Sequence, residues 1–375
     1  MAGGSGHFPL PATARMEIPL TGRVCGVRDV NERKTGHAKT NASDKGFEAK
    51  KEDKKMMKKV FYTLTVAGAA LALTVAFGVE AQARVYKFSG GPSGGTFQYY
   101  ASAVSTLSKK HGMNILASSS GGSIENIRTT NSGKSNFSVA YSGNVYAARN
   151  GLMKGDSKKY EDILALCYLY GAPAQLVVRQ GSGITSTKQL VGKRVGVGNA
   201  GSGAAANAEL FFTELGIWDK IDRNFLGYRQ AAGAFSNKQL DAFWLFTGFP
   251  NASVIEAAMQ NKIDLVDLNK DAESVGMFKK YPYFAKVVIP AETYKGVDKG
   301  TNTFQDSTLM VANSKMPDDV VYNILKAMFS KEGLDYMVSV HKSAKGMSVE
   351  GGIKGIVTPL HPGAIKFWKE MGVIK

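Results

Sequence analysis

The chain has 375 residues, 44% of them hydrophobic, and a formal net charge of +16. That length is enough for two domains or one large two-lobed domain. The basic residues are scattered singly or in pairs, without an arginine-rich arm, so the composition argues against nucleic-acid binding and favours an anionic ligand or surface.

The N-terminal part of the chain has the composition of a leader. Residues 1–55 are polar and basic, and we expect them to be disordered or an over-called start. Residues 56–83 combine two lysines, an apolar run over 60–79 and an Ala-x-Ala ending at Ala83, the three-part layout of a secretory signal peptide. An uncleaved membrane anchor is the alternative, because about 20 apolar residues can just span a bilayer. Cleavage after Ala83 predicts a periplasmic chain of residues 84–375, which keeps 34 of the 47 basic and 23 of the 31 acidic residues.

Cysteine and histidine usage gives no sign of a disulfide, metal or other cofactor. Cys25 lies in the leader, and Cys167 is then alone in an apolar stretch where a structural cysteine is common. The remaining histidines, His111, His341 and His361, are far apart and have no paired spacing. We therefore expect neither a cofactor nor a metal site.

From residue 84 onward, strand-like and helical segments alternate. Strands are predicted at 85–90, 113–119 and 136–142, each followed by a helical pattern. The segment 163–181 predicts two extended pieces broken by Gly171 and Pro173.

The same order then restarts. It predicts strands at 193–198, 240–248 and 307–313, an irregular region at 279–294, and a helix over 316–329 with Pro317 in its first turn. Strand, small-residue turn and helix in repetition predict an α/β fold with mainly parallel sheets, here as two lobes around a cleft.

Five glycine- and serine-rich turns share one position, between a strand and the next helix. Their sequences are SGGPSGGTF, SSSGGS, AYSGN, GNAGSGA and FTGFP. In open α/β sheets the carboxyl ends of the strands line the ligand crevice, and a helix N-terminus offers unpaired N–H groups to an anion. Ordinary tight turns with helix caps are the alternative for any one of them. Five turns in matching positions favour a crevice that holds a carboxylate or a similar group.

Two of these turns also match enzyme patterns. Gly91, Ser93 and Gly95 fit Gly-x-Ser-x-Gly, but a hydrolase needs a base and an acid after the serine, and Pro92 suits the sharp nucleophile turn poorly. An exported serine hydrolase using Ser93 is the alternative function. The glycines at 196, 198 and 201 fit a dinucleotide fingerprint, but Asp219 follows a helix rather than a second strand, so this interpretation is not favoured.

The order of these motifs, from GGPSGGTFQ through SSSGGSIENIRTTNSGKSNFSVAYS and LVGKRVGVGNAGSGAAANAELFFTELG to TPLHPGAIKFWKE, resembles the TAXI-type solute receptors of tripartite ATP-independent periplasmic (TRAP) transporters. The resemblance runs from Arg84 to Lys375. It implies a bilobed type II periplasmic-binding-protein fold, with lobe I at 84–174 and 308–375 and lobe II at 175–307. It further implies a monomer without enzyme activity that captures a small organic anion, such as glutamate, glutamine or 2-oxoglutarate, and delivers it to a TRAP membrane permease.

Matching the family motif by motif places the ligand contacts in the five turns. The predicted ligand-binding residues are Gly95, Thr96, Phe97, Gly122, Ser123, Arg128, Tyr141, Ser142, Ser202, Gly203, Ala204, Thr247 and Gly248. Arg128 is included as the nearest arginine that could pair with a carboxylate.

The sequence departs from the family near the expected hinge. Gly171-Ala172 and Gln175 stand where relatives commonly have Pro-Glu and His, Ala204 replaces Thr and Thr247 replaces Gly. A ligand amino group thereby loses a counter-charge, which argues against a plain acidic amino acid.

Overall fold

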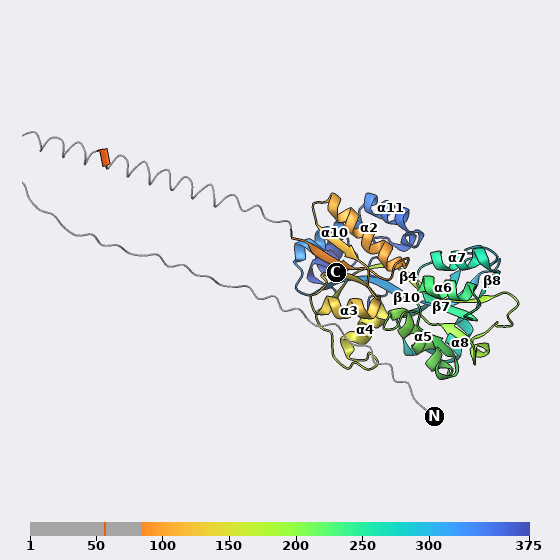
Figure 1. Ribbon diagram of the computed structural model, residues 1–375. Helices are drawn as coiled ribbons and strands as arrows, with labels where there is room; N and C mark the ends of the chain where they lie inside the picture. The colour runs from red at the N-terminus through yellow and green to blue at the C-terminus, as the bar shows by residue number, and fades with distance from the viewer. Residues whose placement is uncertain (1–55, 58–83) are drawn as a thin grey trace, which may run out of the picture. The chain divides into compact units, whose positions relative to one another are not determined.

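The computed structural model describes residues 56–57 and 84–375 (Figure 1). The predicted extension at 1–55 and almost all of the signal peptide at 56–83 lie outside the described residues. None of the described helices is long and apolar enough to cross a membrane.

The first lobe is built on one half of a mixed sheet. Its strand order is β2 (Ile115–Ser118), β1 (Tyr86–Ser89), β3 (Phe137–Tyr141), β10 (Thr301–Asn313) and β4 (Ile163–Arg179). The pairs β1–β2 and β1–β3 are parallel, whereas β10 is antiparallel to both β3 and β4. Parallel strands followed by helices bring the turns after β1, β2 and β3 to the same edge of the sheet.

The second lobe continues the sheet through β4. There the strand order is β4, β7 (Ala242–Phe246), β5 (Arg194–Gly196) and β6 (Asp222–Asn224). In addition, β8 (Ile263–Leu265) pairs with β4, and β9 (Phe284–Ile289) pairs with the first half of β10. The strand β9 lies in the region predicted to be irregular, which is a correction to the sequence analysis.

Two strands, β4 and β10, run through both lobes. The prediction of a break at Gly171 and Pro173 is wrong, because β4 is one strand of 17 residues. Gly171 serves packing rather than a turn, since a Cβ at this position would lie 1.9 Å from Oε1 of Gln305 on the neighbouring strand. The lobe boundaries at 174/175 and 307/308 stay a prediction, because neither strand is interrupted there.

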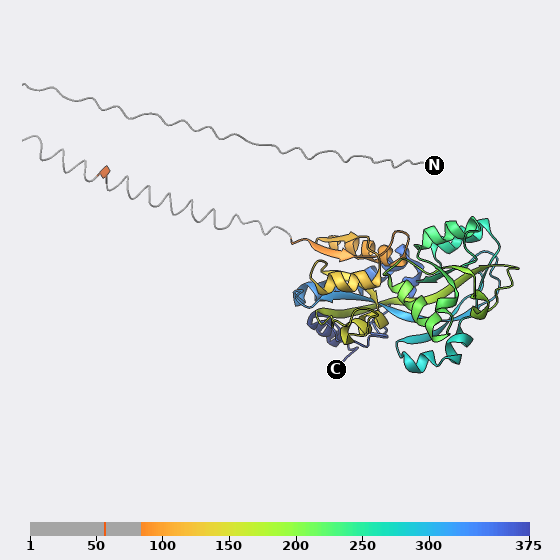
Figure 2. The same ribbon diagram turned by 60° about the horizontal axis from the view of Figure 1, so that its bottom comes forward.

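Helices cover the sheet in both lobes (Figures 1 and 2). They span α2 (Thr96–Lys110), α3 (Ser123–Asn131), α4 (Ser142–Asn150), α5 (Gly203–Glu214), α6 (Tyr228–Ser236), α7 (Ala252–Gln260), α8 (Asn269–Ser274), α9 (Met277–Lys280), α10 (Asp318–Met328), α11 (Lys331–Val340) and α12 (Pro362–Glu370). Short 3-10 helices span Thr187–Leu190, Trp218–Lys220 and Lys342–Gly346. Pro317 is the N-cap of α10 rather than part of its first turn, and Asp318 and Asp319 occupy that turn.

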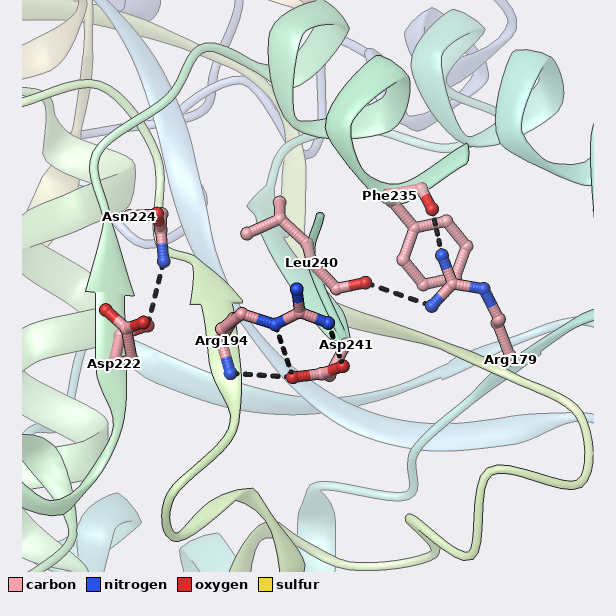
Figure 3. Close-up of polar contacts among 7 residues, drawn as sticks. All are labelled: Arg179, Arg194, Asp222, Asn224, Phe235, Leu240 and Asp241. Atoms are coloured by element: carbon pink, nitrogen blue, oxygen red, sulfur yellow. Dashed lines mark hydrogen bonds and ion pairs between the residues drawn. The ribbon is translucent and has the colours of Figure 1, made fainter. Parts of the chain in front are cut away.

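The distal end of lobe II is anchored by arginines (Figure 3). Arg179 on β4 donates to the carbonyl oxygens of Leu240, at 2.9 Å, and of Phe235 at the end of α6. Its guanidinium also lies 4.0 Å from the centroid of the Phe235 ring. Arg194 binds the Asp241 carboxylate through Nε and Nη2, at 3.1 and 2.8 Å. These contacts fix the end of α6 and the beginnings of β5 and β7, at the opposite ends of these strands from the turns that line the cavity.

Candidate functional site

The turns between strands and helices line a cavity between the lobes. Its volume, measured as the space open to the centre of a water molecule, is about 30 Å³. Lobe I contributes the turns before α2, α3 and α4, and lobe II contributes the turns before α5 and after β7. The lining residues are Pro92, Gly95, Thr96, Phe97, Gly121, Gly122, Ser123, Tyr141, Asn199, Ser202, Gly203, Ala204, Tyr228 and Thr247.

Three of the thirteen residues predicted from the sequence are absent from this lining, and the other ten belong to it. Arg128 pairs with Asp156 at 3.2 Å and is half exposed, so the structure does not bring it to the cavity. The Ser142 hydroxyl donates to the carbonyl oxygen of Gly355 at 2.6 Å. A Cβ on Gly248 would lie 3.2 Å from the side chains of Ser343 and Tyr170, outside the cavity lining.

Four lining residues were missed. Pro92, Gly121 and Asn199 stand within the turns that the sequence analysis singled out, so their position in those turns was a usable signal. Tyr228 opens α6, and no motif in the sequence marks it.

The N-termini of α2 and α5 supply positive potential from opposite lobes. The N-cap of α2 is Gly95, and the N-cap of α5 is Ser202, whose Oγ accepts the N–H of Ala205 at 3.1 Å. Neither helix has an acidic residue in its first turn. The first N–H groups of a helix have no partner within it, so both ends favour a negative charge in the cavity.

The N-termini of α3 and α4 are already engaged by carboxylates. Glu125 Oε2 accepts the N–H of Gly121 at 2.9 Å, and Asp306 Oδ2 accepts the N–H of Gly143 at 2.9 Å. Asp306 is fully buried on β10, and this burial raises the pKa of its carboxyl to about 8 although it also accepts the N–H of Ser307. The N-termini of α2 and α5, by contrast, have no acidic side chain in their first turns.

Direct contacts join the lobes at the cavity. Thr247 Oγ1 of lobe II donates to Thr96 Oγ1 of lobe I at 3.0 Å. Gly203, the first residue of α5, packs so closely on lobe I that a Cβ there would lie 2.5 Å from Ser123 Cβ and 2.8 Å from a ring carbon of Tyr141. The lobes are thus closed on each other across the cavity.

The carbonyl oxygens at the end of β7 already have donors. The Phe246 carbonyl accepts the hydroxyls of Tyr141 and of Tyr228, the latter at 3.0 Å. The Thr247 carbonyl accepts Nε2 of Gln175 at 3.0 Å. Burial raises the pKa of Tyr141, and that of Tyr228 to about 12, so both phenols stay neutral. This wall consequently offers a ligand few acceptors.

The structure gives the serine hydrolase no support. Ser93 is exposed, and none of the hydrogen bonds among the described residues joins it to a histidine or a carboxylate. His341 Nδ1 contacts Ser343 Oγ at 2.7 Å, and His361 Nδ1 accepts the N–H of Gly363 as the N-cap of α12. Within residues 84–375, no three histidine, cysteine or acidic side chains gather to hold a metal ion.

Two α/β lobes that share long strands and close over one cavity define the bilobed fold of periplasmic solute-binding proteins. Residues 88–372 match the NMT1-like family, and the chain belongs to that family.

Solved structures with a similar fold include solute-binding proteins. One is MatC (Rpa3494) from Rhodopseudomonas palustris with bound malate, with 14% identity, a TM-score of 0.48, and coverage of 78% of this chain and 97% of that one. Another is the periplasmic aliphatic sulphonate-binding protein SsuA from Escherichia coli, with 13% identity, a TM-score of 0.41, and coverage of 77% and 83%. At such identities and TM-scores, these likenesses add nothing to the choice of a ligand.

Proposed function

We propose that the chain is the extracytoplasmic solute receptor of a TRAP transporter. It captures a small organic anion by lobe closure and delivers it to the membrane permease. The observation that carries the proposal is the pair of helix N-termini, of α2 and α5, that face one cavity from opposite lobes without an acid in either first turn. The choice of a TRAP permease and the monomeric state rest on the sequence resemblance. Export to the periplasm with cleavage after Ala83 rests on the signal-peptide layout of residues 56–83.

Capture follows from the placement of the donors. An anion held between Thr96 and Ser202 contacts both lobes, so ligand binding favours the closed arrangement over an open one. Each hydrogen bond to a charged group contributes roughly 1.5 to 3 kcal/mol. The anion thereby links the two lobes and stabilises the closed conformation, and the closed receptor then binds the permease.

Native mass spectrometry tests the capture step. The full chain is expressed with its own leader, the exported protein is purified, and its mass is compared before and after denaturation. A small anion that is lost on denaturation supports the receptor. Covalent labelling of Ser93 by a serine-directed probe, absent from Ser93→Ala, would replace the receptor with the hydrolase.

Transport in reconstituted vesicles tests the partner. Vesicles that carry a TRAP permease and an ion gradient, but no ATP, should accumulate the anion only when the receptor is added. Absence of uptake in these vesicles, together with uptake in vesicles that carry an ATP-driven permease and ATP instead, would contradict the TRAP assignment while leaving the capture step intact.

A further inference from the structure

The cavity lacks the carboxylate that would pair with the ammonium group of an amino acid. None of its lining residues is Asp, Glu, Lys, Arg or His, so its potential is set by the helix ends. The N-termini of α2 and α5 are positive, and they favour an anion while they repel a cation. An ammonium group placed here would need a carboxylate or several free carbonyl oxygens.

The nearby carboxylates are committed elsewhere. Asp306 is fully buried, and its two oxygens accept the N–H groups of Gly143, at 2.9 Å, and of Ser307, at 2.7 Å. Burial keeps its pKa raised to about 8, so near neutral pH the carboxyl is mostly protonated. Glu125 is exposed and holds the N–H of Gly121. Neither side chain lines the cavity.

The backbone acceptors are committed as well. The Phe246 carbonyl accepts two tyrosine hydroxyls, and the Thr247 carbonyl accepts the Gln175 amide. A ligand ammonium would therefore meet no carboxylate here and would depend on neutral side-chain oxygens, such as those of Asn199 and Thr96, which stabilise a buried positive charge less well.

We infer that the cavity selects an organic anion that carries no ammonium group: a carboxylate or sulfonate with a neutral, partly apolar body. The neutral body would lie against the ring of Phe97, which packs on Tyr141 with 4.8 Å between the ring centroids. This inference rests on the proposed function and narrows its ligand class.

Matched ligand pairs test it. Calorimetric titration of the purified, unfolded-and-refolded wild-type protein uses 2-oxoglutarate against L-glutamate, lactate against L-alanine, and isethionate against taurine. Within a pair that binds, the member without nitrogen should bind at least about tenfold more tightly, because the ammonium leaves one charged group without its hydrogen bonds.

A carboxylate introduced into the cavity by substitution provides a second test of the inference. Ala204 lines the cavity in the first turn of α5, so Ala204→Asp adds a carboxylate there, and Ala204→Asn adds the same volume without charge. Ala204→Asp should reverse the preference within a pair, whereas Ala204→Asn should weaken both members and keep their order. Thermal unfolding checks both variants, and if Ala204→Asp does not fold, the wild-type pairs alone decide.

The two proposals fail differently. A wild-type protein that binds the amino member of a pair as tightly as its partner, or more tightly, overturns the inference but keeps the anion receptor. If no member of any pair binds and the co-purified ligand is a neutral or cationic compound, the proposed function as an anion receptor is wrong, and the narrower ligand class is wrong as well.

Discussion

Gly203 is a residue on the cavity at which lobe closure leaves no space for a side chain. A Cβ on this residue would lie 2.4 Å from Oδ1 of Asn144, 2.5 Å from Cβ of Ser123 and 2.8 Å from a ring carbon of Tyr141. The three neighbours lie in lobe I, on α4, at the start of α3 and at the end of β3, whereas Gly203 begins α5 in lobe II. Gly203→Ala should therefore hinder closure without disturbing either lobe alone.

The size of the effect follows from the overlap. Carbon atoms in ordinary contact are about 3.5 to 4.0 Å apart, so the lobes must separate by roughly 1 Å to admit the methyl group. Overpacking of this kind costs roughly 1 to 3 kcal/mol, which weakens binding by about 5- to 150-fold when closure and binding are coupled. Unliganded stability should change little, because an alanine replaces glycine in a helix of the separated lobe.

Gly233→Ala is the matched control. Gly233 lies within α6 of lobe II, and a Cβ there would have no atom within 4 Å. Calorimetry with the anion identified by native mass spectrometry gives the affinities, and small-angle scattering gives the compaction on binding. The reasoning is refuted if Gly203→Ala binds as tightly as Gly233→Ala and compacts to the same extent.

Three further outcomes are expected. Arg179→Ala should lower the free energy of unfolding in denaturant titrations by roughly 1 to 3 kcal/mol, because the carbonyls of Phe235 and Leu240 lose a side-chain donor; an unchanged free energy of unfolding would contradict a stabilising role for the contacts shown in Figure 3. Asp306 has its pKa raised from 3.8 to about 8 by burial, so the folded protein retains a proton that the unfolded chain releases between those values. Stability should thus fall as the pH rises from 4 to 8, and Asp306→Asn should flatten this part of the profile; superimposable profiles would contradict it. N-terminal sequencing of exported protein should begin at Arg84, and a start upstream of residue 58 would exclude cleavage after Ala83.

The sequence predicted the cavity through local signals. A strand followed by glycine or serine and then a helix is a short-range pattern, and it located Thr96, Ser123 and Ser202 on the cavity. The fold class could be predicted for the same reason, since repetition of that pattern builds α/β lobes.

What the sequence could not predict depends on long-range packing. Arg128 is occupied by Asp156, 28 residues away, and nothing local announces that ion pair. Asp306 accepts the N–H of Gly143, 163 residues away in the chain, only because β10 pairs with β3. Gly171 suggested a break in β4, yet its lack of a side chain accommodates Gln305 from β10.

The central claim is that one anion is held by Thr96 and Ser202 from opposite lobes, and a double-mutant cycle measured by calorimetry tests it most directly. Because Ser202 is also the N-cap of α5, Ser330→Ala, which removes the N-cap of α11, controls for the loss of a cap. Thr96→Ala and Ser202→Ala should each weaken binding of the co-purified anion about tenfold, and the double variant should depart from additivity, since both donors act on one ligand. If both single variants bind like wild type and like Ser330→Ala, these turns do not hold the ligand.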